Sequence, residues 1–161
     1  MRQPRRLRLD DQLCFSLYAA TNAITRAYRT QLESLGLTYP QYLVMLVLWQ
    51  DGPSTIGHIA KRLCLAQNAI TPLLDRLERS GCLRRVRDLE DRRVVHVQLT
   101  DQGIGMEAAV SLAQQEVECS TLLDAESLHD LRSELFALVS RMEDAEREST
   151  VSQKSKVKPA K

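Results

Sequence analysis

Apolar residues recur every three or four positions near both ends of the chain, a spacing typical of amphipathic helices. The first such segment covers residues 10–35 and is stopped by Gly36, and the last opens at Asp124. Between them, residues 41–49 are almost entirely apolar and predict a helix buried in the centre of the fold. Pro40 suits the first position of that helix, where its missing N–H costs nothing.

The middle of the chain predicts two shorter helices joined by a tight turn. After a Gly-Pro break, Ser54 is a good N-cap for a helix that reaches about Leu63. The next helix begins within residues 66–71 and ends at the Ser-Gly pair of residues 80–81. Pro72 is compatible with this helix because we expect it in the first turn.

The hydrophobic period changes after the fourth helix. Apolar and polar residues alternate over residues 95–99, and with residues 83–86 they predict two short strands around a turn at residues 88–92. Thr100 then caps a fifth helix that runs towards Leu122. The order predicts a mainly α fold, a winged helix-turn-helix. The long N- and C-terminal helices form a dimerisation region, since they carry more apolar surface than so small a core can cover.

We expect a single domain with a short extension at each end. Beyond Glu146 the chain has scarcely an apolar residue, so it cannot bury enough surface to offset its ordering entropy. The expected parts are an N-terminal arm (1–9), one domain (10–146) with dimerisation helices (10–35 and 101–144) and a DNA-binding lobe (about 54–99), and a disordered basic tail (147–161).

Composition and charge narrow the class of protein. The net charge of +1 conceals an asymmetry, because residues 61–99 carry nine basic and five acidic groups while residues 100–150 carry three and twelve. The basic middle suggests an anionic partner. No apolar stretch approaches the roughly 18–20 residues of a membrane span. We therefore expect no membrane association, and acidic residues stand where a signal peptide would have its apolar core.

The cysteines and histidines show no metal-binding pattern. The four cysteines form no CxxC pair, which excludes a zinc ribbon and a disulfide-stapled mini-protein and fits a reducing compartment, the cytoplasm. The three histidines share no ligand-like spacing, so we expect no metal and no cofactor. Cys64 and Cys82 flank the fourth helix and are interpreted as small packing residues.

Several short motifs in the chain resemble those of a known protein family. Asp91-Arg92-Arg93, followed by Leu99-Thr100 and Gly103, resembles the wing signature of MarR-family transcription regulators, D-x-R and then L-T-x-x-G. Within that family, three other segments resemble the OhrR repressors, which sense organic hydroperoxides. These segments are Leu13-Cys14-Phe15 with Leu17-Tyr18-Ala19, then Tyr28, and then Leu37-Thr38-Tyr39-Pro40-Gln41-Tyr42-Leu43.

The resemblance makes Cys14 the candidate redox-sensing residue. It lies near the start of the first helix, where free N–H groups favour a thiolate, although two neighbouring aspartates oppose it. Hydroxyl groups that donate hydrogen bonds to the sulfur would stabilise the thiolate further. The resemblance implies that Tyr28 and Tyr39 are those donors, one or both across the dimer interface. A thiolate attacks the O–O bond of a hydroperoxide and becomes a sulfenic acid. Without such donors, a free cysteine is most often a small buried apolar residue.

The resemblance also makes Cys119 a candidate resolving residue. Some OhrR-like proteins carry a second cysteine in this region that forms an intersubunit disulfide with the sensing one, whereas others have one cysteine and use a small-molecule thiol. The presence of Cys119 favours the two-cysteine type. A disulfide requires that the Cα atoms of the two cysteines lie within about 7 Å of each other. Its formation would therefore move the helices that carry them and tilt the DNA-binding lobes.

The candidate DNA contacts lie on the fourth helix and the wing. Asn and Gln pair with adenine, Thr contacts a thymine methyl or a phosphate, and wing arginines contact the minor groove or phosphates. Arg93 matches the family's minor-groove arginine, and Asp91 is expected to fix that arginine or the hairpin turn. The start of the recognition helix departs from the usual OhrR pattern, so the operator is expected to differ. The predicted contacts are Gln67, Asn68, Thr71, Arg76, Arg84, Arg85, Arg87 and Arg93.

The leading interpretation is a dimeric, cytoplasmic repressor. It binds a pseudo-palindromic double-stranded operator and leaves it when organic hydroperoxides oxidise Cys14. A second hypothesis keeps the fold but makes the signal a small aromatic ligand, bound between helices one, two and five, or another oxidant. An enzyme is not expected: a thiol peroxidase would show a thioredoxin-like βαβ pattern or a CxxC pair, and no catalytic residue is assigned.

Overall fold

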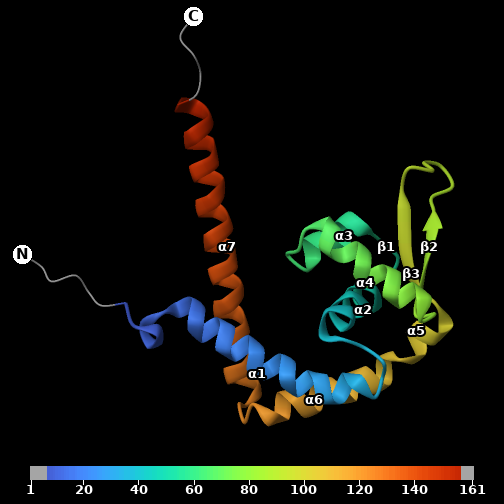
Figure 1. Ribbon diagram of the computed structural model, residues 1–161, viewed down its shortest axis with the longest axis horizontal. Coiled ribbons are helices and arrows are strands. Elements are labelled where there is room, and N and C mark those ends of the chain that lie inside the picture. Colours follow the sequence, from blue (N-terminus) through green and yellow to red (C-terminus); the bar gives the residue numbers. More distant parts are fainter. Residues whose placement is uncertain (1–6, 157–161) are drawn as a thin grey trace, which may run out of the picture. The chain divides into compact units, whose positions relative to one another are not determined.

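The computed structural model describes residues 7–156 (Figure 1). By its contacts the chain divides into two compact units, Met1–Val117 and Glu118–Lys161. The elements in chain order are η1 (Leu9–Asp11), α1 (Leu13–Glu33), α2 (Tyr39–Asp51), β1 (Ser54–Thr55), α3 (Ile56–Arg62), α4 (Gln67–Arg79), β2 (Leu83–Arg87), β3 (Val95–Leu99), α5 (Asp101–Gly105), α6 (Glu107–Ser120) and α7 (Ala125–Lys156).

Helix α2 forms the centre of the N-terminal unit, as its sequence predicts. Thr38 and Gln41 form a capping box at its start: the Thr38 backbone N–H donates to Gln41 Oε1 at 2.8 Å. Pro40 is the second residue of the helix and not the first, because Tyr39 already has helical geometry. Helices α1, α3 and α4 and the sheet pack around α2. The largest fully buried side chains are Leu32, Val44, Met45, Ile59, Ile70, Leu74, Leu77, Leu83, Val97 and Val110.

The helix-turn-helix is made by α3 and α4, and the start of α3 differs from the prediction. Thr55 is the N-cap, and its hydroxyl accepts from the His58 backbone N–H at 3.2 Å. Ser54 was expected to cap this helix, but it is buried and its hydroxyl donates to the Gly52 carbonyl at 3.0 Å. The reason is that Ser54 and Thr55 form β1, which pairs with β3 in the register Ser54 to Val97.

Pro72 lies deeper in α4 than predicted. The helix begins at Gln67, so Pro72 is its sixth residue and stands beyond the first turn. A proline there removes the N–H that would bond to the Asn68 carbonyl. The helix continues because Ile70, Leu74 and Leu77, spaced three and four residues apart, are completely buried on its inner face.

The wing is the predicted antiparallel hairpin of β2 and β3. The sheet order is β1-β3-β2, with Leu83 opposite Leu99 and Arg87 opposite Val95, so β2 is an edge strand. Thr100 caps the next helix as predicted, since its hydroxyl accepts from the Gly103 N–H at 3.2 Å.

The fifth predicted helix is two helices, α5 and α6, separated at Met106. The break follows from the way α5 is held against the turn between α4 and β2. The Thr100 hydroxyl donates to the Gly81 carbonyl at 2.5 Å, and Gln102 Nε2 donates to the Ser80 carbonyl at 3.1 Å. Trp49 of α2 adds a bond from its Nε1 to the Gly103 carbonyl at 3.0 Å. These contacts fix the direction of α5, and the chain turns into α6 after it.

The C-terminal unit is dominated by α7, which Asp124 caps by accepting from the Ser127 N–H at 2.8 Å. The helix runs to Lys156, whereas residues 147–161 were expected to be disordered, and residues 157–161 lie outside the described part. Arg147 forms ion pairs with Glu143 and Asp144, one turn earlier on this helix. Residues 1–6 of the predicted arm also lie outside the described range. The proposed division into arm, domain and tail stays a prediction.

Among the described residues, none of the helices combines the length and the hydropathy that a bilayer crossing requires. The described residues also contain no cluster of three His, Cys, Asp or Glu side chains with the geometry of a metal site.

Replacement of Gly103 by alanine is expected to destabilise the fold. A Cβ at this position would meet the Cys82 carbonyl oxygen at 2.0 Å, a backbone atom that cannot give way without displacing the wing. We expect a loss of about 1–3 kcal/mol in the free energy of unfolding, measured by urea denaturation. Gly105→Ala in the same helix is the matched control, because a Cβ there meets nothing within 4 Å. An equal loss in both variants would contradict the close-approach argument.

Candidate functional site

Cys14 is the second residue of α1 and is exposed to solvent in the single chain. Its sulfur is therefore accessible to a dissolved oxidant. Cys119 is also exposed and lies one residue before the end of α6. Cys82 is buried, which confirms its interpretation as a packing residue. Cys64 is exposed and adopts a left-handed φ of 53° in the turn between α3 and α4, so that interpretation was wrong for it.

Tyr28 and Tyr39 lie together in the structure. Their ring centroids are 5.2 Å apart, and Tyr42 stacks on Tyr28 at 5.1 Å. Tyr28 is buried, whereas Tyr39 is half-buried. Burial, with a further contribution from the charge of Tyr28, raises the pKa of Tyr39, so its hydroxyl stays protonated and able to donate. The sequence analysis did not assign Tyr42 a role, although it follows Tyr39 by one helical turn.

A rigid helix separates this tyrosine cluster from Cys14 of the same chain. Cys14 and Tyr28 both belong to α1 and are fourteen residues apart. At 1.5 Å per residue, their Cα atoms are about 21 Å apart along the axis. Therefore neither Tyr28 nor Tyr39, which packs against it, can donate to the sulfur of its own protomer without loss of the helix.

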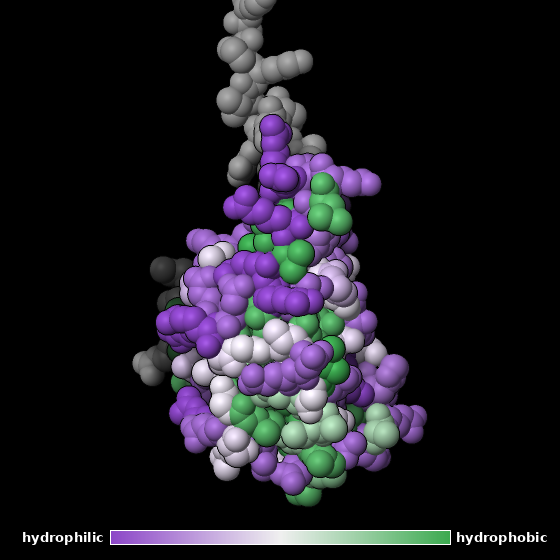
Figure 2. Space-filling model, turned by 90° about the vertical axis from the view of Figure 1, so that its right-hand side faces the viewer, coloured by the Kyte–Doolittle hydropathy of each residue, from purple (hydrophilic) through white to green (hydrophobic). Residues whose placement is uncertain are grey.

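The predicted DNA contacts on α4 are at its exposed N-terminal end and one exposed face. Gln67, Asn68 and Thr71 occupy its first two turns, and Arg76 is exposed further along. The side of the molecule that carries the wing is largely hydrophilic, with smaller hydrophobic areas between the polar side chains (Figure 2). The N-terminal position agrees with the way a recognition helix presents its first residues to base edges in the major groove.

The tip of the wing is an ordered turn held by two aspartates. Asp88 Oδ1 accepts from the backbone N–H groups of Glu90 and Asp91, at 2.8 and 3.0 Å. These backbone hydrogen bonds lower the pKa of Asp88, and His96 Nε2 adds a contact at 3.3 Å. Asp91 Oδ1 accepts from the Arg93 N–H at 3.0 Å, so Asp91 fixes the hairpin turn as expected. Arg93 itself is exposed.

The three other wing arginines that were predicted to contact DNA face different ways. Arg84 and Arg87 are exposed. Arg84 lies across from Gln98 on β3, whose side-chain oxygen, in the orientation that satisfies both amide atoms, accepts from Arg84 Nε at 2.9 Å. Side chains alternate along a strand, so Arg84 and Arg85 point to opposite faces.

Arg85, predicted to contact phosphate, has two carboxylate partners in the structure. Its guanidinium lies against α4, where it forms ion pairs with Asp75 at 2.6 Å and Glu78 at 2.5 Å. Partial burial alone would lower the pKa of Arg85, but the hydrogen bonds to both carboxylates outweigh it and raise the pKa. Sequence reasoning could not find these partners, since they lie seven and ten residues away on another element.

A third ionic cluster joins α2 to α3. Asp51 Oδ2 accepts from His58 Nε2 and from Arg62 Nε, both at 2.8 Å, and Arg62 also donates to Gln50 Oε1 at 2.9 Å. The hydrogen bond from His58, followed by the one from Arg62, lowers the pKa of Asp51. The cluster ties the first helix of the helix-turn-helix to the central helix.

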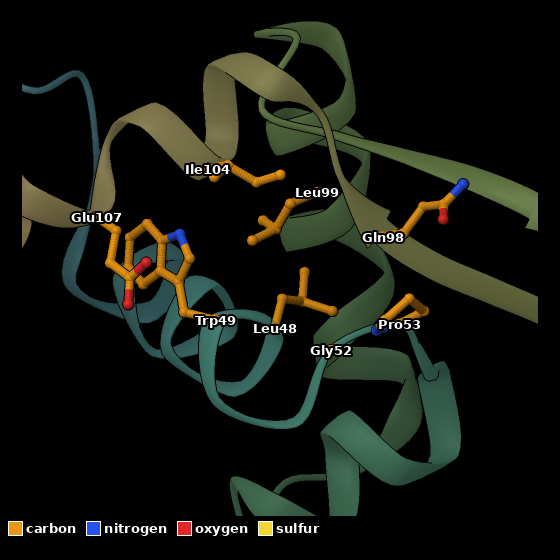
Figure 3. A pocket seen from close by; sticks show the side chains of 8 residues that line it. All are labelled: Leu48, Trp49, Gly52, Pro53, Gln98, Leu99, Ile104 and Glu107. Carbon is orange, nitrogen blue, oxygen red and sulfur yellow. The ribbon is translucent and has the colours of Figure 1, made fainter.

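A pocket of about 340 Å³ lies at the base of the wing, between α2, β3 and α5. Leu48 and Trp49 line it from α2, Leu99 from β3 and Ile104 from α5, and the side chain of Glu107 lies beside the indole ring (Figure 3). Trp49 is the last residue of the segment predicted to form a buried helix, residues 41–49. It is only partly buried, and its ring forms a wall of this pocket.

A second pocket, of about 380 Å³, lies between α1 and the start of α2. Thr25, Arg29 and Glu33 line it from α1, and Tyr39 and Pro40 line it from α2. It combines a cationic side chain with apolar and aromatic ones.

Comparison with known proteins places these features in a family. The model described as MarR family matches residues 37–95. The chain is 45% identical over 138 residues to the HTH-type transcriptional regulator TtmR of Methylorubrum extorquens, covering 80% of this chain and 70% of that protein. It is 37% identical over 134 residues to the organic hydroperoxide resistance transcriptional regulator of Bacillus subtilis, covering 83% and 90%.

Solved structures with the same fold include AbfR of Staphylococcus epidermidis. Reduced AbfR bound to DNA superposes with a TM-score of 0.70 and 36% identity, covering 83% of this chain and 94% of that one. Disulfide-formed AbfR superposes with a TM-score of 0.60 and 37% identity, covering 81% and 92%. The winged helix-turn-helix predicted from the sequence is confirmed.

The Asp51 cluster is expected to make stability depend on acid pH. Because the pKa of Asp51 is lower in the folded chain, its stabilising contribution is present above the unfolded pKa and is lost as pH falls through the folded one. The difference in unfolding free energy between wild type and Asp51→Asn should therefore be largest near neutral pH and shrink in acid. Asp130→Asn, on an exposed stretch of α7, is the control. A difference that does not change with pH would argue against the cluster.

Proposed function

The chain belongs to the MarR family of DNA-binding transcriptional regulators, and we propose that it is a dimeric repressor released from its operator when an organic hydroperoxide oxidises Cys14. The observation that carries the proposal is a sulfur exposed at the start of α1 and a cluster of buried phenols near the other end of the same helix. The relative named for organic hydroperoxide resistance supports the class of oxidant.

The distance along α1 makes a second protomer part of the sensing site. Two copies related by a two-fold axis can place the start of one α1 beside the far end of the other. Tyr28 and Tyr39 of the partner then donate hydrogen bonds to the thiolate of Cys14, which stabilise its charged form. The sequence resemblance allowed either one or both phenols to come from the partner. The helix length favours both.

Exposed apolar side chains supply a surface for such a dimer. In water these side chains would be unfavourable on a monomer, and they gather on α1, α6 and α7. A two-fold dimer also agrees with an operator of two similar half-sites, one for each lobe. The residues concerned are Leu13, Tyr18, Ile24, Leu112, Leu131, Leu135, Phe136, Val139 and Met142.

Tyr18 is a further phenol that the sequence analysis left unassigned. It follows Cys14 by four residues and is 65% exposed, so it shares a face of α1 with the sulfur. The i, i+4 spacing is the signal that could have identified it. In the proposed dimer it borders the sensing site.

The proposed oxidation of Cys14 proceeds in two steps. The Cys14 thiolate attacks one oxygen of the hydroperoxide, the O–O bond breaks, and protonation of the leaving oxygen gives an alcohol and a cysteine sulfenic acid. The thiol of Cys119 from the partner then displaces the sulfenic hydroxyl, which leaves as water, and an intersubunit disulfide forms. Both sulfurs are exposed in the single chain, as this sequence of steps requires.

For the DNA contacts, we assign base recognition to the start of α4 and phosphate contacts to the wing. Gln67, Asn68 and Thr71 face the major groove, with Arg76 beside them, and Arg93 enters the minor groove. Arg84 and Arg87 contact phosphates, which position the protein without specifying sequence. Arg85 is left out of this set because both carboxylates on α4 already hold its guanidinium.

A small aromatic signal remains the second candidate, and the pocket between α1 and α2 favours it. The guanidinium of Arg29 and the phenol of Tyr39 would hold the oxygen atoms of a salicylate-like compound, with Leu37 and Pro40 against its ring. Calorimetry of the fully reduced protein with salicylate distinguishes the two signals. Saturable binding that lowers DNA affinity without oxidant would favour the ligand. The relatives are regulators, and no catalytic role is proposed.

Replacement of Cys14 by serine is expected to abolish oxidant-dependent release. DNA binding by the reduced protein should stay within about twofold of wild type, because Cys14 lies outside the DNA-binding lobe. The measurement is an electrophoretic mobility shift with and without cumene hydroperoxide, and Cys64→Ser is the control for an exposed thiol. Release of the Cys14→Ser variant at the wild-type oxidant concentration would show that this thiol is not the sensor.

Cys119 is expected to control the covalent product. After stoichiometric cumene hydroperoxide, non-reducing electrophoresis should show a crosslinked dimer for wild type, and Cys119→Ser should remain a monomer band. Mass spectrometry should then find Cys14 as a sulfenic acid or as a product of its further oxidation. A crosslinked dimer in Cys119→Ser would eliminate Cys119 as the resolving residue.

A further inference from the structure

We propose that Asp75, Glu78 and Arg85 are positioning residues for DNA recognition, which hold the wing at a fixed angle to the recognition helix α4. Two acidic side chains would then raise the affinity of a DNA-binding lobe for its specific site, although their charge repels phosphate. The inference rests on the DNA-binding function of the family and is independent of the signal that releases the protein.

The geometry of the ion pairs defines one orientation of β2 on α4. Asp75 and Glu78 are three residues apart, so both carboxylates lie on the same face of α4. Arg85 NH2 donates to Asp75 Oδ1 at 2.6 Å and Arg85 NH1 donates to Glu78 Oε2 at 2.5 Å. A planar guanidinium held through two nitrogens by two separate carboxylates has little freedom to rotate.

Glu78 makes an additional contact with the backbone of the wing. Its Oε1 accepts from the Arg85 backbone N–H at 2.9 Å. Because β2 is an edge strand, this N–H would otherwise have no partner in the sheet. Both the side chain and the main chain of Arg85 are thus attached to α4, at the middle residue of the strand.

The attachment matters because the lobe has to fit two grooves at once. The start of α4 enters the major groove while the wing reaches the adjacent minor groove. The outer end of β2 is Arg87, two residues past Arg85, and Arg93 lies beyond it across the hairpin turn. A small rotation of β2 about its base is therefore amplified at the tip, and would remove the wing from its groove while α4 stays in place.

The alternative role for Arg85, a phosphate contact, predicts changes of opposite sign. If Arg85 binds phosphate, removal of a nearby carboxylate frees the guanidinium and strengthens DNA binding. If the three residues position the wing, removal of either carboxylate weakens specific binding. The sign of the effect of Glu78→Gln decides between them. Glutamine keeps an oxygen for the Arg85 N–H and loses only the charge of the ion pair.

The experiment measures DNA affinity of the reduced protein by fluorescence anisotropy over a series of salt concentrations. One duplex is selected from a random-sequence pool by the wild-type protein, and the second is a scrambled duplex of equal composition. We expect Glu78→Gln and Arg85→Gln each to lower the affinity for the selected duplex about tenfold. Affinity for the scrambled duplex should stay as in wild type.

Glu90→Gln is the matched control, since Glu90 lies at the wing tip and belongs to none of the ion pairs found among the described residues. Its loss of negative charge should leave the affinity for both duplexes unchanged or slightly higher. A phosphate contact would instead show as a loss on both duplexes in Arg85→Gln, a salt slope smaller by about one, and tighter binding by Glu78→Gln. That pattern would overturn the proposal.

A conservative variant separates positioning from loss of fold. Asp75→Asn removes one of the two ion pairs of Arg85 and keeps both contacts of Glu78, one to the guanidinium and one to the Arg85 backbone N–H. We expect it to bind the selected duplex less tightly than wild type and more tightly than Glu78→Gln, with thermal melting as the check on folding. If Glu78→Gln and Arg85→Gln unfold, Asp75→Asn still decides, because a folded Asp75→Asn variant that binds the selected duplex as tightly as wild type contradicts the proposal.

Discussion

The length of one uninterrupted helix determines what a single chain can and cannot do. Helix α1 places Cys14 and Tyr28 about 21 Å apart, and its hydrogen-bonded backbone prevents the two ends from approaching. If Tyr28 and Tyr39 are the phenol donors to this sulfur, they must come from another molecule. The same helix exposes apolar side chains that require cover. One geometric constraint therefore links the proposed redox chemistry to the proposed two-fold assembly.

The DNA-binding lobe is held together by polar contacts between elements that are distant in sequence. The ion pairs of Arg85 attach β2 to α4, and the Asp51 cluster attaches α3 to α2. The hydrogen bonds of Thr100 and Gln102 fasten α5 to the turn between α4 and β2. These attachments join the recognition helix, the wing and α5 to one another. We therefore expect a signal that changes DNA binding to displace these elements together.

Hydrophobic periodicity was sufficient to predict the main helices and the hairpin, because burial fixes their faces. It could not predict β1, since a strand of two residues has no period. It also placed Pro72 in the first turn, because Ala66 at the N-cap makes no side-chain cap hydrogen bond to mark where α4 begins. The break at Met106 depends on the long-range packing of Gly103 against Cys82, and no local pattern encodes it.

The candidate site likewise contains residues that the sequence could identify and residues that it could not. The segments that resemble OhrR repressors identified Cys14, Tyr28 and Tyr39 as candidates. The structure brings the two tyrosines together. The motif could not assign Arg85, because an arginine on an exposed strand resembles any other phosphate contact until its neighbours are known. Its partners come from tertiary structure alone. The DNA contacts and the two cysteine roles rest on resemblance and chemistry, and stay predictions.

The break between α5 and α6 gives the proposed disulfide a route to the DNA. Cys119 lies thirteen residues after Met106 on α6, about 20 Å along a rigid helix. If the disulfide forms, we expect the force on that end of α6 to be transmitted along the helix to α5. Because α5 is hydrogen-bonded to the turn between α4 and β2, we expect these elements to turn together. Two lobes that turn in a dimer change the separation of their recognition helices, and a duplex of fixed half-site spacing then fits only one of the two states.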